Sequence, residues 1–315
     1  MPTTRIAPSP TGALHLGNAR TFLINWALAR RSAWRIVLRI EDLDTPRIKP
    51  GVIDLTIDLL AWLGLDWDDG PLIQSLEPAP HLDAIRTLAQ RGRIYPCELT
   101  RAQIEAAASA PQEGAHETPF PASLRPVLLP CAFRDDAPSW RFAVDEQAVV
   151  IADRFAGTRE LHPARSAGDF IVWTRRDADK PGQPAYQLAV VVDDARRGVT
   201  HIVRGDDLLE SAARQVLLYR ALGLGEPPAY YHLPLVRGID GRRLAKRHGD
   251  TRLDHYRARG VPPERIIGLA AFWSGITPSR EPMDTAEFRD RLNLDTIPRS
   301  DVVFGPEDDA WLLQG

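Results

Sequence analysis

The chain has 315 residues, of which 44% are hydrophobic and 26% are charged. These fractions are typical of globular proteins and exclude a disordered or fibrous chain. The length fits about two domains of ordinary size, or one large α/β domain with an insertion. Because the formal net charge is −3, any surface that binds a nucleic acid must be a local basic patch within an acidic shell.

The two cysteines, Cys97 and Cys131, are too few for a disulfide framework, and the amino terminus lacks the apolar core of a signal peptide. The longest apolar run, at residues 185–192, is far shorter than the roughly 20 residues that span a bilayer. The sequence therefore predicts a cytoplasmic protein with no membrane association.

The first third of the chain alternates between strand and helix patterns. Residues 3–31 predict a short strand, a turn rich in proline and glycine, and an amphipathic helix. Residues 34–44 predict a strand that ends in an acidic turn, and residues 52–70 predict a helix closed by glycine. This alternation favours a parallel sheet with crossover helices, in which ligands bind at the carboxyl ends of the strands.

The middle of the chain interrupts this pattern. Residues 106–130 are rich in Ala, Pro, Glu and Ser, which indicates an inserted segment. Residues 139–155 and 169–177 alternate as antiparallel strands do, and residues 185–194 are apolar enough to predict a strand buried on both faces. Residues 198–225 predict another strand, acidic turn and helix, so the α/β pattern resumes there. The acidic, proline-punctuated end of the chain shows no strand pattern.

His15, Leu16, Gly17 and Asn18 fall where the first strand pattern turns into a helix. Helix N-termini attract phosphate through free N–H groups and the helix dipole. An imidazole there adds hydrogen bonds to phosphate oxygens as charge shifts, and a glycine lets an adenine ring approach the backbone. Taken alone, this motif also fits an ordinary surface histidine at a helix start.

Residues 243–249 read RLAKRHG, which by themselves also fit a solvated basic loop. In order and spacing, however, residues 7–20 and this segment resemble the "HIGH" and "KMSKS" elements of class I aminoacyl-tRNA synthetases. The resemblance implies a Rossmann-like parallel sheet and an ATP site that works with Mg²⁺, with His15 and Lys246 as catalytic residues. Arg243 and Ala245 depart from the usual "KMSKS" sequence: Arg243 stands at the position of the first lysine, and Ala245 stands at the position of the first serine. The implied ATP-binding residues are His15, Gly17, Asn18, Arg243, Leu244 and Lys246.

Residues 5–12, 40–47 and 190–209 resemble the glutamate-specific members of this family. The resemblance implies that Arg5 and Arg204 bind the γ-carboxylate, a role that suits the fixed fork of a guanidinium. It also implies that Glu41 holds the α-ammonium group and that Ala7, Ser9 and Tyr186 complete the pocket. The alternative for each arginine is a surface ion pair, for example with Asp206 or Asp207.

Residues 254–276 and 301–313 look like the stem-contact region of these enzymes, and no anticodon-binding domain is expected after it. The resemblance implies a division of the chain into a first catalytic half (1–94), an inserted segment (95–165), a second catalytic half (166–240), and a loop with a helical region (241–315). Residues 185–194 and 204–215 resemble the short glutamyl-queuosine tRNA(Asp) synthetases. The implied acceptor is then the queuosine base in the anticodon loop of tRNA(Asp).

Basic side chains after residue 240 are candidates for phosphate contacts with that RNA, although they fit a solvated, ion-paired face equally well. They are Arg242, Arg247, Arg252 and Arg257. Two other functions stay open: a shortened glutamyl-tRNA synthetase that charges tRNA(Glu), and a non-catalytic paralogue that binds nucleotide or tRNA. The protein is expected to act as a monomer.

Related proteins often carry zinc in the inserted segment. Here Cys97 is kept, but Leu99 stands at the second cysteine and Val127 stands four residues before Cys131. Even with His116, only three ligands would be present, whereas structural zinc requires four. The sequence therefore predicts no zinc, with both cysteines as remnants of a metal site.

Overall fold

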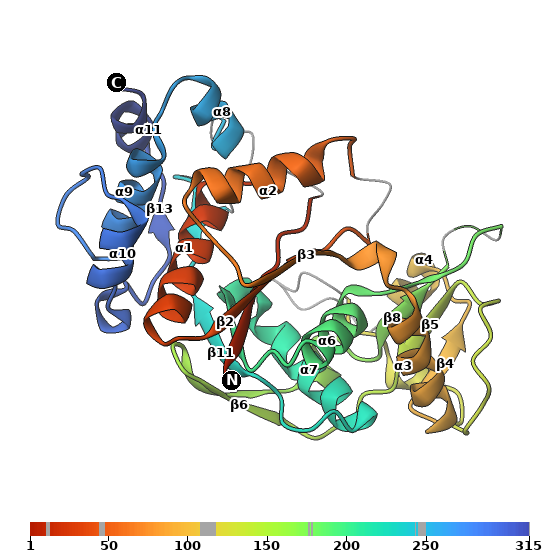
Figure 1. Cartoon of the computed structure of the whole chain (residues 1–315). Helices are drawn as coiled ribbons and strands as arrows, with labels where there is room; N and C mark the ends of the chain where they lie inside the picture. The colour runs from red at the N-terminus through yellow and green to blue at the C-terminus, as the bar shows by residue number, and fades with distance from the viewer. Residues whose placement is uncertain are drawn as a thin grey trace.

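The computed structural model describes residues 1–10, 13–43, 48–107, 118–175, 177, 179–242, 244 and 250–314. A central parallel sheet is built from both halves of the chain (Figure 1). Strands β1 (Thr3–Ile6), β2 (Arg35–Ile40) and β3 (Asp69–Ile73) pair in parallel. Strands β10 (His201–Gly205) and β11 (Ala229–Leu233) form a second parallel pair.

The two parallel sets meet between β1 and β10. The amide of Thr200 donates to the carbonyl oxygen of Thr3 at 2.9 Å, and the amide of Thr3 donates to Oγ1 of Thr200 at 2.9 Å. The spatial order is therefore β3-β2-β1-β10-β11. The order reverses between β1 and β10, and in such sheets the crevice beyond the carboxyl ends at this point is where ligands bind.

Helices cover both faces of the sheet. On one face, α1 (Leu16–Arg31) packs with α9 (Pro263–Trp273) and α10 (Thr285–Arg291) in a core that includes Val203. Val203 therefore faces these helices, whereas its neighbour Ile202 lies in the core on the opposite face of the sheet. This alternation is the period of two expected of a strand.

The opposite core contains three further helices, α3 (Ala79–Gln90), α6 (Tyr186–Arg196) and α7 (Leu209–Leu222). The prediction of a strand at residues 185–194 was wrong, because these residues form most of α6. Six consecutive residues from Gln187 to Val192 are buried there. A helix buried on nearly all sides has no polar face, so a short apolar run does not distinguish it from a buried strand.

The inserted segment forms an antiparallel sheet beside the parallel one, seen to the right in Figure 1. Its order is β4 (Ile94–Cys97), β5 (Ser139–Phe142), β8 (Phe170–Thr174) and β9 (Gln183–Pro184). The antiparallel strands expected at residues 139–155 and 169–177 are thus confirmed. The pairing continues past residue 165 to Pro184.

Shorter elements complete the insertion and the first half of the chain. Strands β6 (Val149–Asp153) and β7 (Gly157–Leu161) form a hairpin that packs against β11. Helices α2 (Val52–Trp62), α4 (Arg101–Ala107) and α5 (Pro163–Ser166) lie outside the two sheets.

The C-terminal region is mainly helical and includes α8 (Leu253–Ala258) and α11 (Pro306–Leu313). The expectation that the end of the chain lacks strands was wrong, since β13 (Val302–Val303) pairs in parallel with β12 (Val236–Arg237). A two-residue strand is too short to give a sequence pattern.

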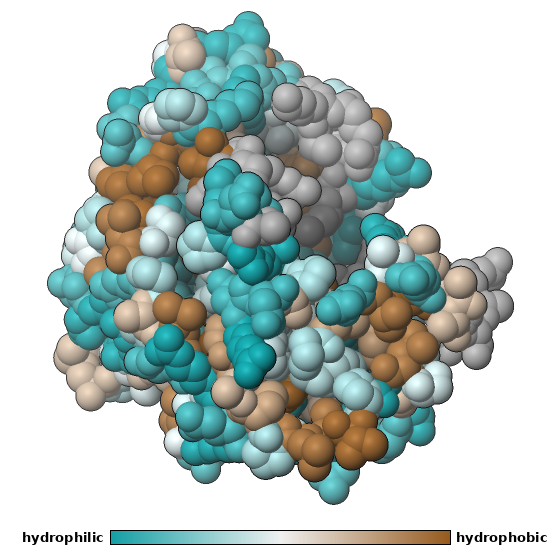
Figure 2. Space-filling model, turned by 90° about the vertical axis from the view of Figure 1, so that its right-hand side faces the viewer, coloured by the Kyte–Doolittle hydropathy of each residue, from teal (hydrophilic) through white to brown (hydrophobic). Residues whose placement is uncertain are grey.

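Figure 2 shows a largely hydrophilic face on which hydrophobic patches are separate from one another. Within the described part of the chain, no helix combines the length and the apolar character needed to cross a lipid bilayer.

Candidate active site

His15 is the N-cap of α1. Its Nδ1 accepts a hydrogen bond from the amide of Gly17 at 3.1 Å, and Oδ1 of Asn18 accepts from the amide of His15 at 3.1 Å. This reciprocal arrangement is a capping box, in which two otherwise unsatisfied backbone donors find partners. An accepting Nδ1 puts the proton of a neutral imidazole on Nε2.

Gly17 lies under the His15 ring. A Cβ atom at this position would lie 3.0 Å from Cε1 of His15 and 3.6 Å from Cβ of Val236. A side chain here would force the imidazole to shift by a few tenths of an ångström, so the close packing favours glycine.

Both flanks of the RLAKRHG segment lie against the start of α1. Leu16 donates its amide to the carbonyl of Thr251 at 3.0 Å, and Leu253 donates to Leu14 at 2.8 Å. These bonds place Arg252 antiparallel to His15. On the other flank, Val236 reaches Gly17. Arg243, Ala245, Lys246 and Arg247 lie outside the described residues, whereas Leu244 is buried.

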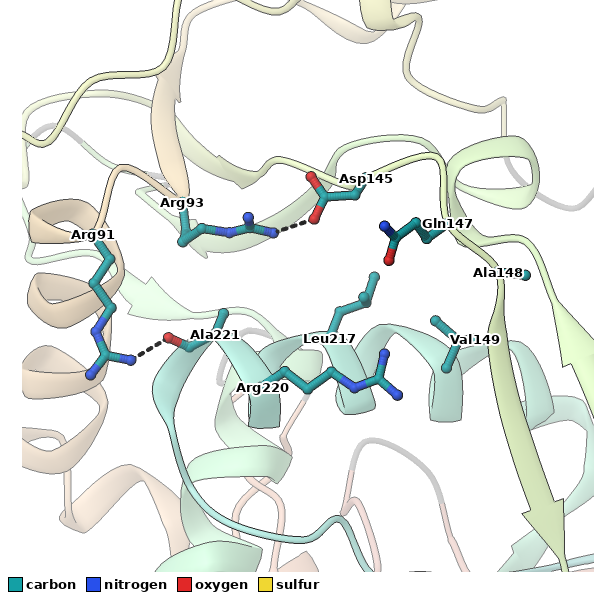
Figure 3. A pocket seen from close by; sticks show the side chains of 9 residues that line it. All are labelled: Arg91, Arg93, Asp145, Gln147, Ala148, Val149, Leu217, Arg220 and Ala221. Atoms are coloured by element: carbon teal, nitrogen blue, oxygen red, sulfur yellow. Dashed lines mark hydrogen bonds and ion pairs between the residues drawn. The ribbon is translucent and has the colours of Figure 1, made fainter.

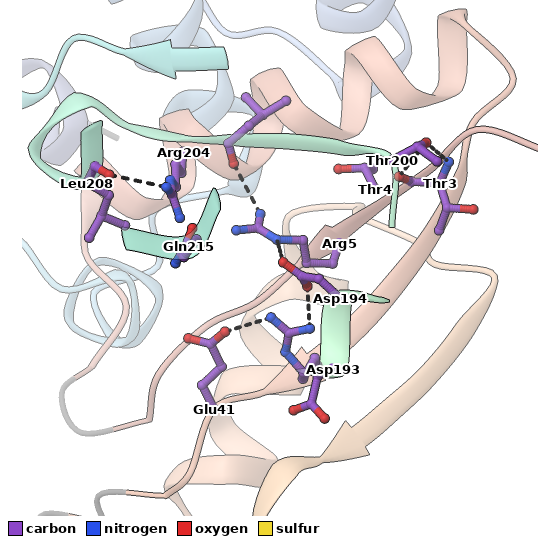
Figure 4. A network of polar contacts seen from close by, with 12 residues as sticks. Thr3, Thr4, Arg5, Glu41, Asp193, Asp194, Thr200, Arg204, Leu208 and Gln215 are labelled. Atoms are coloured by element: carbon purple, nitrogen blue, oxygen red, sulfur yellow. Dashed lines mark hydrogen bonds and ion pairs between the residues drawn. The ribbon is translucent and has the colours of Figure 1, made fainter. Parts of the chain in front are cut away.

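Two buried arginines and one buried carboxylate join β1, β2 and α6 (Figure 4). Nη1 of Arg39 donates to Oδ1 of Asp194 at 2.6 Å, and Nε of Arg5 lies 3.7 Å from Oδ2 of Asp194. Nη1 of Arg5 also donates to the carbonyl of Val203 at 3.4 Å. Burial lowers the pKa of Arg5 although Asp194 opposes that shift. Burial also disfavours the charge on Arg39, but Asp194 and Glu41 outweigh it and raise its pKa.

Glu41 follows the end of β2 and is held by two neighbours. Its Oε1 accepts from Nη2 of Arg39 at 2.9 Å, and its Oε2 accepts from Oγ of Ser9 at 3.4 Å. Ser9 is exposed and Ala7, directly after β1, is half-buried. The segment after β1 and the segment after β2 therefore meet at the edge of the sheet where a ligand is expected.

Arg204 lies near the end of β10 and is only 4% exposed. Its Nε donates to Nε2 of His232 at 3.0 Å and its Nη2 donates to the carbonyl of Leu208 at 3.2 Å. Its Nη1 is buried and has no hydrogen-bond partner among the described residues. Neither Arg5 nor Arg204 forms the surface ion pair that was the alternative. Both side chains are buried, and Arg5 faces the interior carboxylate of Asp194.

Tyr186 begins α6 at the rim of this site. The residue is 40% exposed, yet its pKa is raised, chiefly because protein surrounds its hydroxyl and secondly because Glu41 is near. Arg204 and Arg5 act in the opposite direction on the same pKa. The structure thus brings Arg5, Glu41, Tyr186 and Arg204 into one electrostatic environment.

The chain matches the family described as tRNA synthetases class I (E and Q), catalytic domain, over residues 2–301. The chain belongs to this family. The resemblance to class I synthetases and the α/β catalytic fold expected from it are thereby confirmed.

Individual relatives agree with the family match. The chain is 46% identical to the glutamyl-Q tRNA(Asp) synthetase of Rhodopirellula baltica, covering 95% of this chain and 93% of the relative. It is 45% identical to the protein of that name from Symbiobacterium thermophilum, covering 99% and 98%. The glutamate–tRNA ligase of Synechococcus sp. is 36% identical, and 67% of its length is covered.

The fold is also found in a solved structure. The glutamate-tRNA synthetase of Elizabethkingia anophelis superposes with a TM-score of 0.76 at 24% identity, with 99% of this chain and 69% of that one covered. At this identity the likeness shows the shared fold.

Sequence reasoning missed four residues that hold the predicted site residues in place: Arg39, Asp153, Asp194 and His232. Arg39 and Glu41 are two residues apart, so a strand would place them on one face. The pair Asp193–Asp194 follows a long apolar run, which indicates two buried carboxylates. Because buried carboxylates require partners, this pair was a second signal for an interior ion pair. Asp153 and His232 carried no motif.

The basic residues expected to contact RNA are partly ion-paired in this structure. Arg252 pairs with Asp250 and Asp254, and Arg257 pairs with Asp58. Arg242 is exposed, and Arg247 lies outside the described residues. Arg252 and Arg257 therefore have the carboxylate partners that the ion-paired alternative requires.

The two cysteines are free thiols. Cys97 is buried in a small core with Tyr95 and Phe120, and Cys131 is half-buried. Leu99, at the position of the second cysteine in the expected zinc motif, is partly exposed. The described residues here do not fit a four-ligand zinc site, and His116 lies outside them.

A cavity of about 290 Å³ lies elsewhere, between α3, α7 and the start of β6 (Figure 3). Arg93 pairs there with Asp145 at 2.9 Å, and Arg91 donates to the carbonyl of Ala221 at 2.5 Å. None of its lining residues was predicted as part of the site. Arg91 and Arg93 therefore already have partners.

Proposed function

We propose that this protein activates glutamate with ATP and transfers it to the queuosine base of tRNA(Asp). The observation that carries the amino-acid part is Nη1 of Arg204, which is buried beside Arg5 and has no hydrogen-bond partner in the described part of the chain. A buried guanidinium nitrogen without a partner is costly, and a ligand carboxylate would satisfy it with a strong, charge-assisted hydrogen bond.

The remaining residues fit the other groups of a glutamate molecule. Glu41 supplies a carboxylate for the α-ammonium group, and Ser9 orients that carboxylate. Tyr186 offers a hydroxyl at the rim, and Ala7 leaves room beside the end of β1. In our proposal the α-carboxylate would face the helix start at His15, where the phosphates of ATP are favoured.

The first reaction step needs no nucleophile from the protein. An oxygen of the α-carboxylate attacks the α-phosphorus of ATP, the bond from that phosphorus to the bridging oxygen breaks, and pyrophosphate leaves. Mg²⁺ bound to the phosphates would neutralise part of their charge. His15, Gly17, Asn18, Leu244, Arg243 and Lys246 would hold the nucleotide, with Lys246 stabilising charge on the departing phosphates.

The proposal that tRNA(Asp) is the acceptor rests on the relatives named as glutamyl-Q tRNA(Asp) synthetases. This chain covers almost the whole length of these relatives. Arg242, Arg247, Arg252 and Arg257 would contact phosphates of the anticodon loop. For Arg252 and Arg257 this requires exchange of their carboxylate partners for phosphate.

One experiment tests both parts. Purified protein receives labelled glutamate, ATP and Mg²⁺ together with tRNA(Asp) containing queuosine, the same tRNA with guanosine in its place, or tRNA(Glu). We expect label only on the queuosine-containing tRNA(Asp). Label on tRNA(Glu) alone would instead identify a shortened tRNA(Glu)-charging enzyme. Failure to exchange pyrophosphate into ATP with glutamate, with or without RNA, would support a non-catalytic protein.

A further inference from the structure

We infer that Asp153 and His232 form a buried relay that orients Arg204 and thereby sets its affinity for the substrate carboxylate. The inference rests on the proposed role of Arg204 in glutamate binding and adds two positioning residues to it. Neither residue is expected to touch the substrate.

The direction of each hydrogen bond in the relay is fixed by its donors. Nε of Arg204 carries a hydrogen and always donates, so Nε2 of His232, 3.0 Å away, must accept. The ring proton of a neutral His232 is then on Nδ1, which donates to Oδ2 of Asp153 at 2.6 Å. Asp153 thus selects the one neutral tautomer of His232 that accepts from Arg204.

The relay is rigid because its far end is tied to the backbone. Oδ1 of Asp153 accepts from the amides of Phe155 at 2.9 Å and Ala156 at 2.6 Å. His232 is 1% exposed, and its ring stacks on Tyr230 with centroids 5.6 Å apart. Little room is left for either side chain to rotate.

Two of the three guanidinium nitrogens of Arg204 are therefore occupied on the protein side. His232 holds Nε, and the carbonyl of Leu208 holds Nη2 at 3.2 Å. These two bonds fix the plane of the guanidinium and leave Nη1 for a ligand. The planar guanidinium group binds a carboxylate well only when the orientation of the guanidinium is fixed.

The relay gives the inserted segment a part in amino-acid binding. Asp153 is the last residue of β6 in the β6–β7 hairpin, whereas His232 and Arg204 lie on paired strands of the parallel sheet. The amide of Arg154 donates to the carbonyl of Tyr230 at 2.8 Å and holds the hairpin against β11.

The decisive variant is Asp153→Asn. An asparagine keeps Oδ1 for the amides of Phe155 and Ala156 but places an NH₂ donor where Oδ2 was, beside Nδ1 and the main-chain amide of His232. His232 would then accept on Nδ1 and carry its proton on Nε2, facing the N–H of Arg204. In ATP–pyrophosphate exchange we expect KM for glutamate to rise about ten-fold or more, with KM for ATP changed less than about two-fold. The preference for glutamate over glutamine should fall in parallel.

His232→Gln separates the relay from a general loss of packing. Glutamine has no tautomers and offers Oε1 as an acceptor to Arg204, so its glutamate KM should be closer to that of the parent. In His232→Phe, which has no nitrogen for Asp153 to orient, adding Asp153→Asn should cause little further change in KM for glutamate. Additive effects in this cycle would overturn the relay.

Asp135→Asn is the matched control within the insertion. Asp135 accepts from Nε1 of Trp173 at 3.0 Å and from the amide of Gly182 at 2.7 Å, and it has no contact with the relay. It should leave KM for glutamate unchanged. An Asp153→Asn protein with the KM of the parent would contradict the inference while leaving the proposed function intact.

The tautomer is measurable without any substrate. In protein labelled with ¹⁵N-histidine, long-range ¹H–¹⁵N spectra should show His232 neutral and protonated on Nδ1, and Asp153→Asn should move the proton to Nε2. A parent protein protonated on Nε2, or on both nitrogens, at neutral pH would refute the relay. If the parent protein never exchanges pyrophosphate with glutamate, the proposed function fails, and the spectra still decide the relay.

Discussion

Arg39 and Asp194 are both almost completely buried, and Nη1 of Arg39 donates to Oδ1 of Asp194 at 2.6 Å. The pair fastens the end of β2 to α6, two elements from opposite halves of the chain. Arg5 approaches the same carboxylate from β1. One aspartate therefore compensates two interior cations directly below the proposed amino-acid site.

Asp194→Asn should destabilise the protein by about 3–5 kcal/mol, because it leaves buried guanidinium groups without their counter-charge. Chemical denaturation monitored by circular dichroism measures this free energy of unfolding. The control is Asp83→Asn, which removes an exposed pair with Arg86 and should cost no more than about 1 kcal/mol. Equal costs for both variants would show that the buried pair contributes little.

Arg5→Lys should raise KM for glutamate in pyrophosphate exchange by about ten-fold, because an ammonium group does not reproduce the fork of a guanidinium. Arg35→Lys is the matched control, since Arg35 begins β2 and pairs with Asp69 at the opposite edge of the sheet. If both variants keep the KM of the parent, Arg5 does not bind the carboxylate.

Lys246→Ala should lower the rate of adenylate formation more than about ten-fold, since losing about 1.4 kcal/mol of transition-state stabilisation is enough for that. The melting temperature should not change. Lys180→Ala, which removes an exposed lysine paired with Asp177, should keep the full rate. An unaltered rate for Lys246→Ala would show that the segment has another task.

The stability of the protein should fall as the pH drops below about 6.5, the ordinary pKa of histidine. Burial lowers the pKa of His232 despite the opposing hydrogen bond that its ring donates to Asp153, and Arg204 lowers it further. The folded state therefore keeps His232 neutral while the unfolded chain takes up a proton, so stability that is present above this pH is lost as the pH falls towards the folded pKa.

Replacing His232 by glutamine should reduce this pH slope by up to about 1.4 kcal/mol per pH unit, the contribution of one proton. Unfolding free energies measured from pH 7.5 down to about pH 5 provide the comparison. His162→Gln, at a half-exposed histidine beside Glu160, is the control. A slope that His232→Gln leaves unchanged would place the proton uptake at another group.

Sequence patterns located the parts of the fold that repeat a clear period. The strand, turn and helix at residues 3–31 and the second set at residues 198–225 were both predicted, because their polar and apolar residues alternate visibly. Helix α6 was missed since tertiary burial removed its polar face. The sequence could not indicate that β10 lies beside β1. That contact depends on two hydrogen bonds between Thr3 and Thr200, which are far apart in the chain and belong to no pattern.

The site divides in the same way. Arg5, Glu41, Tyr186 and Arg204 were found through the family resemblance, and the structure brings them together. The supporting residues Asp153 and His232 belong to no motif, and their relation depends on how the inserted hairpin packs on β11. Such partners emerge only once distances between side chains are known.

The antiparallel contact of Leu14 and Leu16 with Thr251 and Leu253 has a consequence for dissection of the protein. About three-quarters of the chain separates these two backbone segments, yet each supplies the other's hydrogen bonds at the start of α1. A fragment truncated before Thr251 would retain every strand of the parallel sheet and still expose the His15 turn. Attempts to define a minimal activating unit should therefore keep the chain through α8.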